Sequence, residues 1–214
     1  MSHYLVAVIR DTEKSLSLED MMAPYDEEVK VAPYVDLTKT EIINKVKEIQ
    51  RRALEKETFL EGDSIIRSIS SDEEYYDYYR NEWYEDGWYD EDGNLLTTYN
   101  PNSKWDWYDV GGRWNGVLRI KDEFVYEELG EVPVEGEKYY TNSAPIGHLD
   151  LTDFINTYAV VTPDGRWHEP GKMGWFGISY ASKEDEASWD EGFYDRFIRN
   201  ANPEWEITIV DCHI

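Results

Sequence analysis

Residues 4–9 read YLVAVI, an unbroken apolar run that is closed by Arg10 and Asp11. Such a run is typical of a buried strand, and it is too short for a membrane span or for the apolar part of a signal peptide. Near the other end, residues 205–210 read WEITIV, and their alternation predicts a second strand. We therefore expect one α+β domain over residues 1–214, with a mostly antiparallel sheet that includes both terminal strands.

Two or three helices are expected to pack on this sheet. Thr38 and Glu41 form a capping box, and apolar residues then recur at helical spacing from Ile42 to Ala53. A second helix is predicted over residues 184–200, where Trp189, Phe193 and Phe197 recur every four residues. These elements together favour the α+β class over an all-α or all-β fold.

Residues 72–92 read DEEYYDYYRNEWYEDGWYDED and hold ten acids, eight aromatic residues and one base. Their first half predicts a short surface helix and the rest a loop, which we interpret as an insertion in the domain. Tyr and Trp are favoured anchors of protein interfaces, so this stretch is a candidate surface for a basic partner. The residues predicted to contact that partner are Glu73, Glu74, Tyr76, Asp77, Tyr78, Glu82, Glu85 and Asp86. The alternative is a half-buried helix with a solvated acidic face.

The whole chain is acidic, because 46 acids against 21 bases give a formal charge of -25. This charge argues against direct binding to nucleic acid or to an anionic membrane, since phosphate affinity comes from Lys and Arg. It permits an acidic surface that occupies a basic site on another protein, although solubility alone also explains it. The single cysteine, Cys212, excludes a disulfide framework and a Cys-based zinc site, and we expect a cytoplasmic protein.

Neither a metal ion nor another cofactor is expected from the motifs. The loop that starts at Asp90 lacks the EF-hand spacing, and the four histidines show no HxxH or HxxxH pattern. The chain also lacks a GxSxG nucleophile elbow and a phosphate-binding glycine loop. The sequence thus leaves enzymatic activity open, and favours a protein that acts by binding.

Residues 100–116 read NPNSKWDWYDVGGRWNG, and a second Gly-Arg-Trp occurs at residues 165–167. One interpretation is a pocket in which tryptophan faces stack on a flat ligand and cations hold its anionic group. The residues predicted to line it are Lys104, Trp105, Asp106, Trp107, Arg113, Trp114, His168 and Trp175. The other interpretation is an aromatic core in which Arg113 pairs with Asp106 or Asp109 and the glycines mark bulges or turns. An enzyme acting on a nucleotide or sugar would use Asp106, Arg113, His168 and Glu169.

The run from Asp90 to Gly116, with the APYDE loop at residues 23–27, resembles an uncharacterised family of bacteriophage and mobile-element proteins of Gram-positive bacteria that carries an NPxxKWDWYxxGGRW motif. The resemblance implies a small accessory protein in the host bacterial cytoplasm, and such proteins often act on host defence. We therefore expect a non-enzymatic counter-defence inhibitor whose acidic aromatic surface occupies a basic, nucleic-acid-binding site of a host protein. The alternatives are binding or sequestration of a nucleotide-like ligand in the pocket, or an enzyme acting on a nucleotide or sugar there. The oligomeric state stays open.

Overall fold

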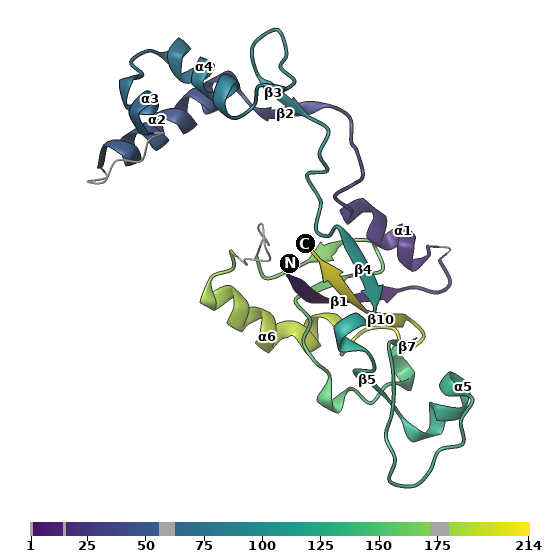
Figure 1. The fold of residues 1–214 in the computed structure, drawn as a ribbon. Coiled ribbons are helices and arrows are strands. Elements are labelled where there is room, and N and C mark those ends of the chain that lie inside the picture. Colours follow the sequence, from purple (N-terminus) through teal and green to yellow (C-terminus); the bar gives the residue numbers. More distant parts are fainter. Residues whose placement is uncertain (1, 15, 56–62, 172–179) are drawn as a thin grey trace. The chain divides into compact units, whose positions relative to one another are not determined.

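The computed structural model describes residues 2–14, 16–55, 63–171 and 180–214, and its contacts group into two compact units. The first unit combines Met1–Val29 with Asn100–Ile214, and the second is Lys30–Tyr99. Helices and strands are both present, and the two terminal strands lie in one sheet, so the predicted α+β class is confirmed (Figure 1). Each unit is described by itself below.

The first unit is built around a six-stranded mixed sheet. Its strands are β1 (His3–Arg10), β4 (Trp107–Val110), β7 (Ser143–Pro145), β8 (Ala159–Val161), β9 (Trp167–His168) and β10 (Glu206–His213). A separate two-stranded ribbon pairs β5 (Leu118–Ile120) with β6 (Tyr139–Thr141). The helices of this unit are α1 (Leu18–Met22), α5 (Val125–Leu129) and α6 (Lys183–Phe197).

The pairing of β1 with β10 is the centre of the sheet. The two strands are antiparallel over their full length, from the pair His3 and His213 to the pair Arg10 and Glu206. The other edge of β10 is shared, because β7 pairs with its first half and β4 with its second half. On the far side of β1, β8 is parallel and is followed by antiparallel β9. The chain ends therefore meet at one end of the sheet (Figure 1).

Each face of the sheet packs its own apolar cluster, because side chains alternate along the strands. On one face, Leu5, Ala7 and Ile9 pack with Phe193 and Trp189 of α6. On the other face the cluster contains Tyr4, Val6, Val8, Met21, Met22 and Trp105. The α6 helix begins with a capping box formed by Ser182 and Asp185. It confirms the predicted helix, which ends three residues earlier than expected.

The second unit has a helical core. It consists of β2 (Tyr34–Leu37), α2 (Lys39–Glu55), α3 (Asp63–Ser68), α4 (Asp72–Glu82) and β3 (Leu95–Thr97). Thr38 and Glu41 form the predicted capping box at the start of α2 through reciprocal hydrogen bonds. The apolar face of α2 packs against tyrosines of α4 and against Leu95 of β3. The α2 helix thus belongs to this unit's own core, and the expectation that it packs on the main sheet is wrong.

Candidate functional site

The first tryptophan of the KWDWY run belongs to the core. Trp105 is 7% exposed, and it lies edge-on to Tyr108 with ring centroids 4.9 Å apart. It joins the apolar cluster on the α1 face of the sheet. Its indole nitrogen is buried and has no hydrogen-bond partner among the described residues. Trp105 is therefore a packing residue and offers no open stacking face.

Lys104 is committed to an ion pair. Its Nζ lies 2.6 Å from Oε1 of Glu169, and the other oxygen of that carboxylate accepts a hydrogen bond from Nε1 of Trp167. The carbonyl of Lys104 accepts a hydrogen bond from the Tyr4 hydroxyl. The pair is largely buried, with side-chain exposures of 20% for Lys104 and 12% for Glu169. Lys104 thus ties two chain segments together and is not a free cation.

The Gly-Gly pair lets the backbone approach β10 closely. Gly112 has a φ of 46°, and a Cβ added there would lie 2.4 Å from Cβ of Asp211. The next residue, Arg113, donates its backbone N–H to Oδ2 of Asp211 over 3.0 Å. The guanidinium of Arg113 is exposed and makes no ion pair within the described part of the chain. The glycines therefore mark a turn, as the core interpretation expected, but Arg113 does not pair with Asp106 or Asp109.

Two histidine–carboxylate pairs lie side by side where β1, β10 and β4 meet. Nδ1 of His3 lies 2.9 Å from Oδ1 of Asp211, and Nδ1 of His213 lies 2.6 Å from Oδ1 of Asp106. The two imidazole centroids are 5.1 Å apart. An ionised carboxylate only accepts hydrogen bonds, so Nδ1 of each ring carries the proton that is donated to the carboxylate. Nε2 is the ring nitrogen that takes no part in this bond. We call these four residues the His–Asp cluster.

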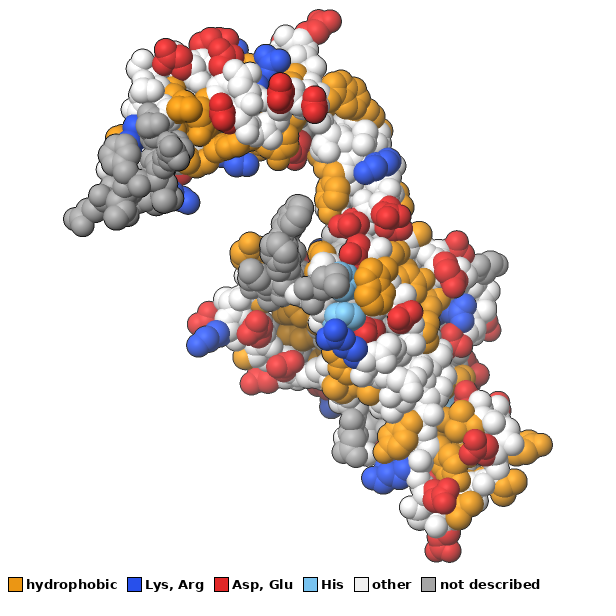
Figure 2. All heavy atoms as spheres, viewed as in Figure 1, with side chains coloured by type: hydrophobic (Ala, Val, Ile, Leu, Met, Phe, Trp, Pro, Cys, Tyr) orange, Lys and Arg blue, Asp and Glu red, His pale blue; other side chains and the backbone are white. Residues whose placement is uncertain are grey.

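Trp107 covers this cluster. Its ring stacks on His213, with centroids 4.9 Å apart and planes 14° from parallel, and it meets His3 edge-on at 5.3 Å. Trp107 is nevertheless 42% exposed. His213 is only 3% exposed, and its Nε2 is buried without a hydrogen-bond partner among the described residues. Figure 2 shows histidine beside basic, acidic and hydrophobic side chains on the visible surface of this unit.

The other residues predicted to line the pocket lie away from the His–Asp cluster or outside the residues that the structure describes. Trp114 packs, partly buried, with the apolar cluster on the α6 face of the sheet. His168 lies on β9, where its Nε2 is 3.0 Å from Oγ1 of Thr162 and burial lowers its pKa. Trp175 lies outside the described residues. Of the predicted set, Asp106 and Trp107 contribute side chains at the His–Asp cluster, and Arg113 contacts it through its backbone N–H.

His3, His213 and Asp211 were missed by the sequence interpretation. Local spacing does not reveal them, because residues 3 and 213 lie at opposite ends of the chain. End-to-end antiparallel pairing of the two predicted strands, residues 4–9 and 205–210, places His3 opposite Asp211. The structure instead pairs His3 with His213, so the sequence could have suggested His3 beside Asp211 but not the two histidines as neighbours.

The acidic segment forms a helix that is buried on one side only. Tyr75, Tyr76 and Tyr79 of α4 face the core of the second unit, and Tyr78 is partly buried. Tyr76 also donates its hydroxyl hydrogen to the carbonyl of Gly93. Of the predicted contact residues, Tyr76 is therefore buried and already has a partner, whereas all six acids are exposed.

Some of these acids already have local roles. Glu73 pairs with Lys39, and Glu74 accepts hydrogen bonds from Ser70 that lower its pKa. Their neighbour Asp72, which is not in the predicted set, pairs with Lys47. Four others make no ion pair with a described residue: Asp77, Glu82, Glu85 and Asp86. Asp77 and Glu82 lie on α4, and Glu85 and Asp86 lie in the segment that follows it.

Three exposed aromatic rings accompany the four unpaired acids. Trp83 is 40% exposed, Tyr84 45% and Trp88 52%. Tyr84 stacks on the buried Tyr79 ring at 5.0 Å, and Trp83 lies edge-on to the same ring at 5.4 Å. Two of the rings are thus held in place by the core. We call the set Asp77, Glu82, Trp83, Tyr84, Glu85, Asp86 and Trp88 the acidic aromatic surface, and Figure 2 shows acidic and hydrophobic side chains interspersed on the unit that carries α4.

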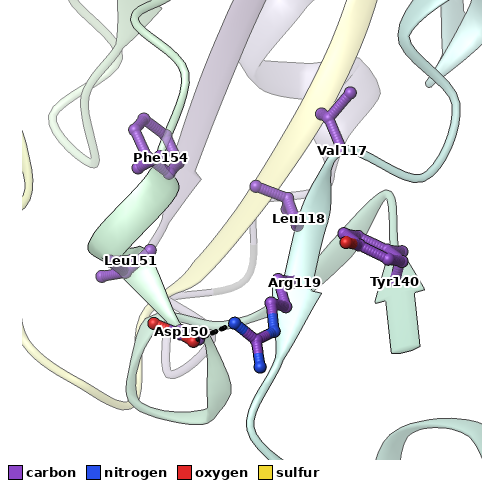
Figure 3. Close-up of a pocket in the computed structure, with 7 residues that line it drawn as sticks. All are labelled: Val117, Leu118, Arg119, Tyr140, Asp150, Leu151 and Phe154. Atoms are coloured by element: carbon purple, nitrogen blue, oxygen red, sulfur yellow. Dashed lines mark ion pairs between the residues drawn. The ribbon is translucent and has the colours of Figure 1, made fainter. Parts of the chain in front are cut away.

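One enclosed hollow of the first unit is small and lies away from these residues. It is lined by Val117, Leu118, Arg119, Tyr140, Asp150, Leu151 and Phe154 (Figure 3). An ion pair of 2.8 Å between Arg119 and Asp150 closes one side. Its volume of about 60 Å³ holds a few water molecules, whereas pockets for drug-sized ligands measure several hundred Å³. This hollow is therefore not a ligand site for a nucleotide-sized molecule.

Comparisons with known proteins add no relative: no family model, no curated protein and no solved structure matches this chain. Among the described residues, three or more His, Cys, Asp or Glu side chains nowhere gather in a group that could hold a metal ion. A search of the same residues finds no helix with the length and apolar character needed to cross a membrane.

Proposed function

We propose that this protein acts by binding a basic site on another protein through its acidic aromatic surface. The resemblance to bacteriophage and mobile-element proteins suggests the setting, a bacterial host in which a nucleic-acid-binding defence protein is the target. In this proposal the protein is a counter-defence inhibitor, and its carboxylates occupy the groove that nucleic acid phosphates would otherwise fill.

One observation carries the proposal: large aromatic rings stand exposed on a rigid support, beside carboxylates that make no ion pair with a described residue. Trp83 and Tyr84 are fixed against the buried Tyr79 ring, so little side-chain entropy is lost when a partner covers them. Buried Trp and Tyr anchors supply much of the affinity in protein interfaces. The surrounding acids then select a basic partner and speed its association.

Charge separates this target from nucleic acid itself. Residues 72–92 contribute a net charge of -9, because they hold ten acids and one base, to a total of -25. Such a surface repels phosphates and attracts a cluster of Lys and Arg. Binding should therefore weaken steeply as salt rises, and heparin should compete, because this polyanion occupies the same basic groove.

The experiment compares two fourfold variants of the full-length protein. The test variant neutralises the unpaired acids: Asp77→Asn, Glu82→Gln, Glu85→Gln and Asp86→Asn. The control variant removes the same charge from exposed acids of the first unit: Glu123→Gln, Glu127→Gln, Glu131→Gln and Glu135→Gln. Both variants are used to capture proteins from a bacterial lysate, and binding of the identified partner is then measured against salt and heparin.

We expect the test variant to lose the partner while the control variant keeps it. Trp88→Ala should weaken binding further without unfolding the protein, because this ring is half exposed. If both fourfold variants bound the partner equally and more weakly than the native protein, net charge rather than the position of the acids would determine binding. A partner that binds the test variant as tightly as the native protein would rule out the acidic aromatic surface.

A further inference from the structure

We propose that His3 and His213 form a proton-transfer centre that hydrolyses a phosphate ester carrying an aromatic ring, as in a nucleotide. The centre lies in the first unit, in the His–Asp cluster, so it is separate from the acidic aromatic surface. If this centre proves inactive, the binding proposal is unaffected. If the binding proposal proves wrong, the proposal of a proton-transfer centre is likewise unaffected.

The orientation of the two imidazoles is the first argument. Each ring is held through Nδ1 by its own carboxylate, at 2.9 Å for His3 and 2.6 Å for His213. A carboxylate in this position fixes the tautomer that leaves Nε2 able to accept a proton, and it stabilises the imidazolium that results. Asp211 is itself positioned by the backbone N–H of Arg113. The cluster thus contains two oriented bases supported by hydrogen bonds behind them.

The second argument is that burying these polar groups costs folding free energy. The side chains of Asp211 and His213 are 3% and 4% exposed, and each is paired with a more exposed partner, His3 at 12% and Asp106 at 31%. Burying the charged member of such a pair costs free energy that the attraction to its partner repays only in part. Nε2 of His213 is also buried without a partner among the described residues, and an unsatisfied buried polar atom costs about 1–3 kcal/mol. Such a cost is expected where a group waits for a ligand atom.

The proximity of the rings explains the chemistry. The ring centroids are 5.1 Å apart, and in this proposal both imidazoles act on one phosphorus centre. His3, with 12% side-chain exposure against 4% for His213, faces solvent more and is assigned as the base. Water gives a proton to Nε2 of His3 while its oxygen bonds to phosphorus. The bond from phosphorus to the leaving oxygen breaks, and that oxygen takes the proton from Nε2–H of His213.

The rim of the cluster indicates the substrate. Trp107 keeps 42% of its surface open, and its ring can exchange the stack on His213 for a stack on a substrate ring, which uncovers Nε2. The exposed guanidinium of Arg113 makes no ion pair in the described part of the chain and suits a phosphate. Three carboxylates face the site, since exposed Asp109 lies opposite Asp211 in register. Arg113 and one protonated imidazole oppose that charge.

Hydrolysis of bis(4-nitrophenyl) phosphate and of a panel of nucleotides tests the proposal, with absorbance and phosphorus NMR as readouts. We expect a bell-shaped dependence of rate on pH, because the base must be neutral and the acid protonated. His3→Gln and His213→Gln should each lower the rate by about 100- to 10,000-fold. Asp106→Asn should also lower the rate, because His213 loses the carboxylate that orients its ring.

The chain offers a matched control in His148. This histidine also pairs through Nδ1 with a carboxylate, at 2.6 Å from Oε1 of Glu128, and stacks on Phe124, but it has no second imidazole beside it. His148→Gln should leave hydrolysis unchanged, as should the fourfold variant of the acidic aromatic surface. If either cluster variant fails to fold, Arg113→Ala replaces it, because that side chain is exposed and its loss should raise KM.

Three results would overturn the proposal. The first is that the folded native protein releases no product from any of these phosphate esters between pH 5 and 9. Product could form at the same rate in His3→Gln and His213→Gln. The rate could also be independent of pH over the range in which imidazoles titrate, which would exclude them as the acid and base.

Discussion

The Lys30–Tyr99 unit builds its core from helices that follow one another in sequence, whereas the other unit joins strands from both chain ends. The ion pairs of the helical unit are exposed and join its acids to lysine or arginine. The sheet unit buries His213 and Asp211 and half-buries the pair of Lys104 and Glu169. An exposed charge suits recognition of a partner, while a buried and oriented one suits chemistry, and the proposals for the two units follow this difference.

The largest expected effect tests whether the two cores are independent. Phe193→Ala removes a fully buried ring from α6 and should destabilise the sheet unit by about 3–5 kcal/mol. Ile42→Ala should destabilise the helical unit by about 2–5 kcal/mol. Hydrogen exchange followed by mass spectrometry reports each unit separately. Loss of protection in both units from either substitution would mean that they unfold together.

The next largest effect concerns the close approach of Gly112 to Asp211. Gly112→Ala places a methyl group against Asp211 at a positive φ, and we expect a loss of about 3 kcal/mol. Gly165→Ala is the control, because Gly165 has a φ of 79° and nothing within 4 Å of the added Cβ. Its cost should be about 1–2 kcal/mol, from backbone strain alone. Equal losses in urea unfolding would show that Gly112 is needed only for its φ.

Sequence patterns predicted the parts of the fold that depend on neighbouring residues. The strand at residues 4–9, the capping box at Thr38 and the helix predicted over residues 184–200 each depend on local sequence patterns, and each is confirmed, the helix with bounds Lys183–Phe197. The pairing of the terminal strands followed from their placement at both ends. The split into two cores was not expected, since α2 has an apolar face that suits either a sheet or another helix.

The candidate site was only partly predictable, because strand register decides it. Trp105 and Trp107 are two residues apart and similar in sequence context, yet one is buried in a core and the other covers the His–Asp cluster. The cluster draws residues from positions 3, 106, 211 and 213, which only non-local pairing brings together. Likewise, α4 ends at Glu82, so Trp83 leaves the helical face that Tyr75 and Tyr79 share and becomes exposed.

A smaller effect compares one ion pair from each unit. Glu169→Gln leaves the half-buried Lys104 ammonium without its carboxylate, and we expect a loss of about 2 kcal/mol. Asp72→Asn breaks the exposed pair with Lys47 and should cost less than about 1 kcal/mol. Salt should weaken only the second pair, because exposed charges are screened far more than buried ones. If the cost of Asp72→Asn were the same at 0.05 and 0.5 M salt, the contrast between the two units would be contradicted.

The smallest effect concerns the two capping boxes, one in each unit, which should behave alike. Hydrogen bonds from Ser182 lower the pKa of Asp185, and hydrogen bonds from Thr38 lower the pKa of Glu41. A carboxyl group with a depressed folded-state pKa stabilises the protein above its unfolded pKa, and this stability is lost as pH falls through the folded value. Ser182→Ala and Thr38→Ala should each cost about 1 kcal/mol at pH 7 and progressively less below about pH 4. Urea unfolding of each variant from pH 7 to pH 3 measures this convergence. A cost that stays constant down to pH 3 would mean that the ionised carboxylate contributes nothing to the cap, and a cost confined to one variant would show that the two units differ even in this local motif.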